Sequence, residues 1–191
     1  MKIKATKAWH KMPTAHAQWF DKEADGSLGE CASWHGYDRS VKMTFAGNVD
    51  EMGWIFPFGE LRKVKAFLEY YFDHTAVIPA NDPRKDAILE FNKTMQPQMF
   101  QARVLPYGVS MEMSSLFIFE QVNPYIYQTT GGRCYIEKVE CIEHDSNAAY
   151  LEVDETTAKK QAQLAIPSGE FMVMKPEWDW VEPQQALSKY K

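Results

Sequence analysis

A cysteine, a histidine and a tyrosine follow one another closely in the first third of the chain, at Cys31, His35 and Tyr37. If the segment from His35 onward is a strand, side chains two residues apart point to the same face, so His35 and Tyr37 face one point. A preceding turn would hold Cys31 near them. The stretch therefore predicts a reaction centre.

An Asp-His pair, Asp73 and His74, follows a helix predicted over residues 59–72. A thiol becomes a useful base or nucleophile when its pKa is lowered, and a histidine held by a carboxylate can lower it. The same pair is also a common end to a helix, because histidine is favoured at the negative end of the helix dipole. If the pair is catalytic, we expect it to close around one cavity with Cys31 and Glu143.

Metal ligation is the chemistry that two histidines indicate. Catalytic zinc sites use three protein ligands and leave one position open, and His16 and His35 are the candidates. In an extended segment His10 would lie about 20 Å from His16, too far to share an ion. Tyr37 is better placed, although its phenol must lose a proton, with an ordinary pKa of about 10, before it can ligate.

Two carboxylates and a hydroxyl complete the candidate residues. Glu143 stands where a strand should end, and a carboxylate there could accept two parallel N–H bonds from a guanidine-like ring edge. An exposed strand-end glutamate is the alternative. Glu112 and Ser110 stand at the start of a predicted helix, where the helix dipole favours an acidic residue without any function.

The whole chain has the composition of one globular domain. It has 191 residues, 45% of them hydrophobic, and a formal net charge of -5. The lack of a dense basic run argues against nucleic acid as a partner, and no apolar run approaches the roughly 18 residues of a membrane helix. We therefore expect a soluble, cytoplasmic protein. Three widely spaced cysteines are a poor basis for a disulfide framework.

The periodicity predicts an α+β domain with helices on one face of an antiparallel sheet. Irregular strand-like sequence covers residues 2–19, and residues 40–46 alternate as a half-buried strand. Residues 53–58 read as extended and 78–83 as a break. Helices are predicted over 59–72, 84–93 and 110–125, and a hairpin over 134–142 and 148–153.

Six segments, taken in order, resemble the family of 6-pyruvoyl-tetrahydropterin and 6-carboxytetrahydropterin synthases. The run from Cys31 to Tyr37 is similar to the family signature C-x3-H-G-H, with Tyr37 in place of the second histidine. The other five are Thr14 to His16 (S-A-x-H), Gly53 to Leu61 (G-x-[VI]-x-D-F-x-x-L, with Pro57 for aspartate), Phe72 to His74 (L-D-H), Ser110 to Glu112 (T-S-E) and Ile142–Glu143, which contains the pterin-anchoring glutamate.

The resemblance implies the tunnelling fold, in which trimers stack into homohexamers with sites at subunit boundaries. It implies a Zn²⁺ ion held by His16, His35 and Tyr37, proton transfers by Cys31, Asp73 and His74, and pterin binding by Glu143, Glu112 and Ser110. The tunnelling domain would span residues 1–153, with an insertion at about 82–107 and a C-terminal extension over 154–191 that packs on the domain or on a neighbouring subunit.

The short gap between Cys31 and His35 is similar to the bacterial carboxytetrahydropterin synthase branch, which serves queuosine and other deazaguanines. The implied substrate is 7,8-dihydroneopterin triphosphate and the implied reaction is a lyase step to 6-carboxytetrahydropterin. Two alternatives remain: a metal-poor pterin- or purine-binding relative that keeps the pocket and has lost the lyase step, and a tunnelling-fold enzyme acting on another pterin or with 6-pyruvoyl-tetrahydropterin synthase activity.

Overall fold

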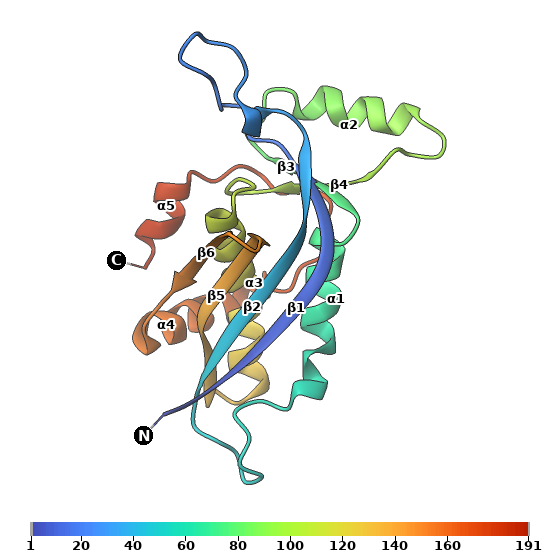
Figure 1. Ribbon diagram of the computed structural model, residues 1–191. Coiled ribbons are helices and arrows are strands. Elements are labelled where there is room, and N and C mark those ends of the chain that lie inside the picture. Colours follow the sequence, from blue (N-terminus) through green and yellow to red (C-terminus); the bar gives the residue numbers. More distant parts are fainter. Residues whose placement is uncertain (1, 191) are drawn as a thin grey trace.

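A computed structural model describes residues 2–190 as one mixed six-stranded sheet with helices packed on it (Figure 1). The strands lie side by side in the order β4-β3-β1-β2-β5-β6. They are β1 (Ile3–His16), β2 (His35–Gly47), β3 (Thr75–Pro79), β4 (Gln101–Leu105), β5 (Cys134–His144) and β6 (Asn147–Glu152). The helices are α1 (Arg62–Phe72), α2 (Lys85–Thr94), α3 (Met111–Thr129), α4 (Glu155–Ala165) and α5 (Pro183–Ser188), with 3-10 turns η1 (Glu30–Ala32), η2 (Phe58–Leu61) and η3 (Ile166–Ser168).

The long antiparallel ladder of β1, β2 and β5 is the centre of the sheet. Its alternating side chains pack against α1 and α3, which lie behind the sheet in Figure 1. Val41, Met43 and Phe45 on β2 are fully buried, as their alternation predicts. At one end of this ladder His16 pairs directly with His35, so β1 and β2 bring the two imidazoles together. The predicted α+β fold is confirmed.

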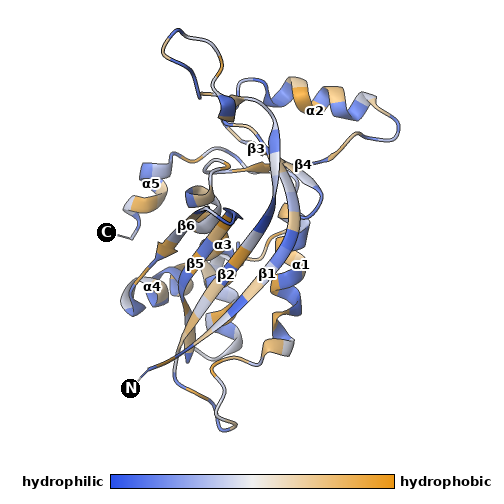
Figure 2. Cartoon of the chain, viewed as in Figure 1, coloured by the Kyte–Doolittle hydropathy of each residue, from blue (hydrophilic) through white to orange (hydrophobic). Residues whose placement is uncertain are grey.

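The two strands β3 and β4 run parallel to β1, which makes the sheet mixed. The sequence interpretation placed a break over residues 78–83 and missed β3, because all five residues of β3 are buried and show no alternation. A strand covered on both faces reads as a continuous apolar run. Strand β4 and helix α2 are built from the segment at 82–107, and Figure 2 shows apolar and polar residues mixed along α2.

The segment over residues 53–58 forms bends and the start of η2, so the prediction that it continues extended is wrong. Asp50 is the physical reason: its Oδ1 accepts hydrogen bonds from the backbone N–H groups of Met52 (3.0 Å) and Trp54 (2.8 Å). Such Asx turns compete with strand pairing.

Helix α3 continues through Pro124 to Thr129, beyond its predicted end. Proline removes the hydrogen bond to the carbonyl four residues earlier, here that of Glu120. The side chain of Gln161, on α4, donates to this carbonyl instead, over 3.1 Å. The C-terminal segment thus replaces the hydrogen bond that Pro124 cannot make, a compensation that the sequence pattern around α3 does not reveal.

The chain after β6 packs on α3 and along the edge of the sheet. Asn123, fully buried on α3, donates to the Ala158 carbonyl and to Gln161, and accepts from the Ile136 N–H of β5. Further on, the backbone N–H of Val104 on β4 donates to the Pro176 carbonyl. This contact covers part of an edge strand that would otherwise present unpaired backbone groups. No helix in residues 2–190 has the length and apolar character needed to span a membrane.

Candidate active site

A polar hollow of about 370 Å³ lies where β1 ends, β2 begins and α3 begins. The sequence predicted six of its lining residues as functional, and they come from four separate segments of the chain. They are His16, Cys31, His35, Ser110, Glu112 and Glu143. The fold therefore brings together most of the predicted site within a single chain.

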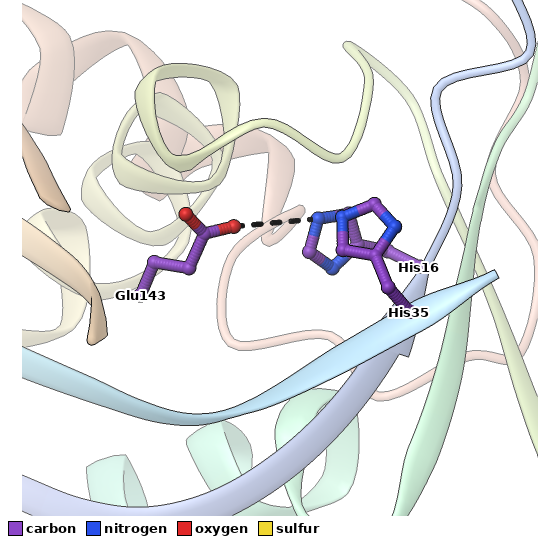
Figure 3. A group of neighbouring side chains, drawn as sticks. All are labelled: His16, His35 and Glu143. Atoms are coloured by element: carbon purple, nitrogen blue, oxygen red, sulfur yellow. Dashed lines mark ion pairs between the residues drawn. The ribbon is translucent and has the colours of Figure 1, made fainter. Parts of the chain in front are cut away.

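Two imidazoles and a carboxylate form the centre of the hollow (Figure 3). One possible ligand atom from each of His16, His35 and Glu143 lies within 4.8 Å of the other two. The two imidazole rings meet edge to face with 4.4 Å between centroids, and Oε1 of Glu143 lies 3.6 Å from Nε2 of His16. Two histidines and a glutamate are a donor set of catalytic zinc sites. This cluster could hold a metal ion.

The state of the two imidazoles fits metal ligation. His35 donates a hydrogen bond from Nδ1 to the Ser33 carbonyl over 2.7 Å, which leaves the Nε2 lone pair free for an ion. Burial, together with the nearby charges of Arg39 and His35, lowers the pKa of His16 to about 3, so His16 is neutral near pH 7. Within residues 2–190, the buried Nδ1 of His16 has no hydrogen-bond partner. A neutral imidazole is the form that binds a metal, and the His16 nitrogen that faces Glu143 is Nε2.

Tyr37 lies beside this cluster, and the third group at the centre is Glu143. The Tyr37 ring is 40% exposed, with its centroid 5.8 Å from that of His35 and 5.2 Å from that of His144. The resemblance implies Tyr37 as the third ligand and Glu143 as the anchor of the pterin ring. The geometry also places the Glu143 carboxylate against the histidines, so this residue of β5 could serve as a third donor.

Cys31 is exposed and lines the hollow, in the 3-10 turn η1 of the segment that joins β1 to β2. Its backbone N–H donates to Oδ2 of Asp21 over 3.0 Å, which fixes the position of the residue. Partial burial raises the pKa of the Cys31 thiol, and the carboxylates of Asp21, Glu143 and Glu30 raise it further. Within residues 2–190 of one chain, the charged groups that shift this pKa are carboxylates and not the cation that would activate the thiol.

Ser110 and Glu112 line the same hollow as the histidines. Ser110 is the N-cap of α3, and its Oγ accepts from the Met113 N–H over 3.3 Å. Glu112 lies in the first turn, where the helix dipole favours a negative charge. Both residues thus have a structural reason for their positions and also face the hollow.

Asp73 and His74 lie outside this hollow, so the expectation that they close around one cavity with Cys31 and Glu143 is not met within a single chain. Oδ1 of Asp73 lies 2.7 Å from Nδ1 of His74, and the His74 side chain is 79% exposed. The backbone N–H of His74 donates to the Pro13 carbonyl, and its φ of 55° turns the chain sharply into β3. His74 instead lines an apolar hollow of about 1040 Å³ with Tyr37, Ile88 and Phe91.

Two residues at the site escaped the sequence interpretation. The guanidinium of Arg39 is buried against the start of α3, where it donates to Ser114 Oγ (2.9 Å) and to the Val109 carbonyl (3.4 Å). Burial lowers its pKa to about 10. A sequence signal existed, because Arg39 falls on the buried face that Val41 and Met43 define by alternation. His144, which touches both Glu143 and Tyr37, had no such signal.

Comparison with known proteins agrees with this architecture. The model of the family "6-pyruvoyl tetrahydropterin synthase" matches residues 6–154, and the chain belongs to this family. No curated protein matches the chain.

Solved structures show the same fold at low sequence identity. An uncharacterized protein from Wolinella succinogenes has a TM-score of 0.69 at 16% identity, over 81% of this chain and 99% of that one. The 6-pyruvoyl tetrahydropterin synthase of Caenorhabditis elegans has a TM-score of 0.53 at 18% identity, over 81% and 97%. The Plasmodium vivax enzyme of the same name has 0.51 at 18%, over 80% and 99%. The matched fold is the tunnelling fold that the sequence predicted.

Proposed function

We propose that this protein is a tetrahydropterin synthase-type lyase that acts on 7,8-dihydroneopterin triphosphate, and that its product is 6-carboxytetrahydropterin, for queuosine or other deazaguanines. The observation that carries the proposal is the single hollow in which His16, His35, Glu143 and Cys31 meet Ser110 and Glu112. Membership of the family supplies the reaction class. Conversion to 6-pyruvoyl-tetrahydropterin is the closest alternative chemistry.

His16, His35 and Glu143 would hold the ion, and Zn²⁺ is the ion that we propose. When bound, it would polarise a substrate oxygen and favour loss of a proton from a neighbouring carbon or hydroxyl. The donor set of two histidines and a carboxylate leaves a position for that oxygen. Glu143 then serves the ion, and Glu112 is the carboxylate left in the hollow to accept the N–H groups of the pterin ring. Ser110 lies next to it.

Cys31 would move a proton on the substrate side chain. Its thiol lies on the rim of the same hollow as the two histidines, and a general base must lie within reach of the proton it takes. Its raised pKa means that a positive partner must approach before it can act at neutral pH. The Asp73–His74 pair is our candidate for this positive partner.

We infer that Asp73 and His74 act in the site of a neighbouring copy of the chain, in a cytoplasmic trimer or hexamer. Two observations support this inference: the His74 imidazole is exposed, and it lies in an apolar hollow outside its own chain's site. The Asp73 carboxylate fixes the His74 ring through Nδ1, which leaves Nε2 available to a partner. In a closed ring of subunits, every site would combine Cys31 and the two histidines of one chain with Asp73 and His74 of its neighbour.

A pterin-binding protein without lyase activity is the second candidate. The specific observation in its favour is the Cys31 thiol, whose pKa is raised rather than lowered within one chain. Such a protein would bind the pterin at Glu112 and Ser110 and leave it unchanged.

The experiment that separates the candidates is incubation of Zn²⁺-loaded protein with 7,8-dihydroneopterin triphosphate, followed by mass spectrometry of the products. The proposal predicts 6-carboxytetrahydropterin with acetaldehyde and triphosphate. Accumulation of 6-pyruvoyl-tetrahydropterin would support the alternative activity. Intact substrate together with tight pterin binding would establish the binding protein and overturn the lyase proposal.

A further inference from the structure

We propose that His144 is a positioning residue for the metal site, and that it holds the Glu143 carboxylate in the orientation that completes the set with His16 and His35. This inference rests on the proposed function in that it requires a metal at this site. It goes further by assigning a role to a residue outside the motifs that resemble the family.

The Glu143 carboxylate lies between two imidazoles. Its Oε1 is 3.6 Å from Nε2 of His16, and its Oε2 is 3.9 Å from Nε2 of His144. The side-chain amide of Asn147 donates to the same Oε2 over 3.4 Å. One oxygen therefore faces the ligand cluster, and the other faces outer partners that can fix the rotation of the carboxylate.

A bulge in β5 makes this arrangement possible. Neighbouring residues of a regular strand point to opposite faces, which would separate Glu143 from His144. The register of β5 against β6 shifts between Ile142 and His144, where the hairpin turns. Such a bulge re-aims a side chain, and here it lets the side chains of Glu143 and His144 approach each other.

The hydrogen bonds of His144 and His35 indicate that the two imidazoles have different roles. His144 accepts at Nδ1 from the backbone N–H of Ser146 over 3.2 Å, so its neutral ring carries the proton on Nε2, which faces Glu143. His35 donates from Nδ1 to Ser33, so its Nε2 has a free lone pair. His144 is thus set to donate to the carboxylate, whereas His35 is set to bind an ion.

Tyr37 supports the His144 ring. The two rings lie 5.2 Å apart between centroids, and the Tyr37 ring also contacts His35. The residue that stands in place of a motif histidine therefore packs between a ligand imidazole and the imidazole that we propose to hold Glu143. This gives Tyr37 a packing role at the site that requires no deprotonated phenol.

The test is a Zn²⁺ competition titration against a chromophoric chelator with the full chain and three variants. His144→Ala removes the donor, His144→Gln keeps an N–H near the Nε2 position, and His10→Ala removes an exposed histidine that contacts Ser40, away from the site. Loss of a group that orients a ligand weakens metal affinity about 10- to 100-fold. We expect that loss in His144→Ala, affinity within about threefold of the natural protein in His144→Gln, and no change in His10→Ala.

Co²⁺ substitution gives a second readout that a purely structural role would not move. The inference predicts that His144→Gln keeps the visible absorption spectrum of the Co²⁺ protein, because the ligands are unchanged. Natural affinity in His144→Ala would overturn it. Equal losses in both His144 variants, with an altered Co²⁺ spectrum, would also overturn it and make His144 a ligand.

Turnover is measured separately from metal binding. A protein that binds Zn²⁺ with the expected His144 dependence but leaves the pterin triphosphate unchanged would overturn the proposed lyase function and leave this inference standing. A natural protein that takes up no Zn²⁺ would overturn the inference itself. Thermal unfolding of each metal-free variant shows whether its fold is intact.

Discussion

Nε2 of His16 and Oε1 of Glu143 lie 3.6 Å apart, although their strands β1 and β5 are separated in the sheet by β2. The intervening strand contributes His35, which pairs directly with His16. Three neighbouring strands thus each supply one group to the same point. Placing the donors on strands rather than loops gives the site a rigid support.

Replacement of Glu143 separates its two possible roles. If the carboxylate is a metal donor, Glu143→Gln should weaken Zn²⁺ binding by more than about 100-fold, the upper range for losing an outer partner of a ligand. Glu112→Gln, in the same hollow, serves as the control and should keep metal affinity while weakening pterin binding. Chelator competition and pterin fluorescence measure the two affinities. Natural metal affinity with weakened pterin binding in Glu143→Gln would restore Glu143 to its predicted role as ring anchor.

Loss of the Cys31 thiol should remove turnover without removing substrate binding. The proposal gives the thiol a proton-transfer role, and it lies on the exposed rim of the hollow. Cys31→Ala should therefore bind pterin within about threefold of the natural protein and fall at least about 100-fold in turnover. Cys134→Ala, at a buried residue of β5 whose thiol has its pKa raised by burial to about 12, is the control. Retained turnover in Cys31→Ala would exclude the thiol from the mechanism.

Sharing of the site between chains can be tested by mixing two inactive variants. Cys31→Ala and His74→Ala each remove one half of the proposed site, so each should be inactive alone. In a ring assembled at random from equal amounts, about a quarter of the sites would combine an intact Cys31 with an intact neighbouring His74. Co-expression with two affinity tags and purification through both gives the mixed particles. Activity that stays at background in those particles would contradict the shared site.

Acid should destabilise the metal-free protein through His16. The unfolded chain takes up a proton near the ordinary pKa of 6.5, whereas burial keeps folded His16 neutral down to about 3. Because the unfolded state binds more protons in this window, the free energy of unfolding falls as the pH falls from 6.5 toward 3. At about 1.36 kcal/mol per unit of pKa difference, the loss can reach a few kcal/mol.

Urea titrations of chelator-treated protein at several pH values measure this slope. His16→Gln has no titrating group at this position and should show a flatter profile. The matched control His10→Gln should keep the natural slope, because His10 is exposed. Parallel profiles for His16→Gln and the natural protein would show that His16 titrates normally when buried.

The sequence predicted the elements whose burial alternates or follows a helical period. Strand β2 and helices α1, α2 and α3 are of this kind. Strand β3 was missed because burial of all five of its residues removes any period. The extent of α3 was missed because Gln161, distant in sequence, supplies the hydrogen bond that Pro124 removes.

At the site, the sequence predicted which residues belong to the hollow better than it predicted how they are grouped. Residue types and order identified His16, His35 and Cys31, which lie together. The position of Glu143 against the two histidines depends on a bulge in β5 and on the placement of β5 beside β2, and neither is encoded in local spacing. The position of His74 depends on a turn with positive φ that directs it out of the hollow.

The account depends most on a metal ion between His16, His35 and Glu143, and anomalous X-ray diffraction at the zinc absorption edge from crystals grown with Zn²⁺ tests it most directly. The account predicts one anomalous peak per chain at about 2.0–2.2 Å from an imidazole nitrogen of each histidine and from a Glu143 oxygen. A fully folded hollow with no peak there, or a peak at other residues, would contradict it.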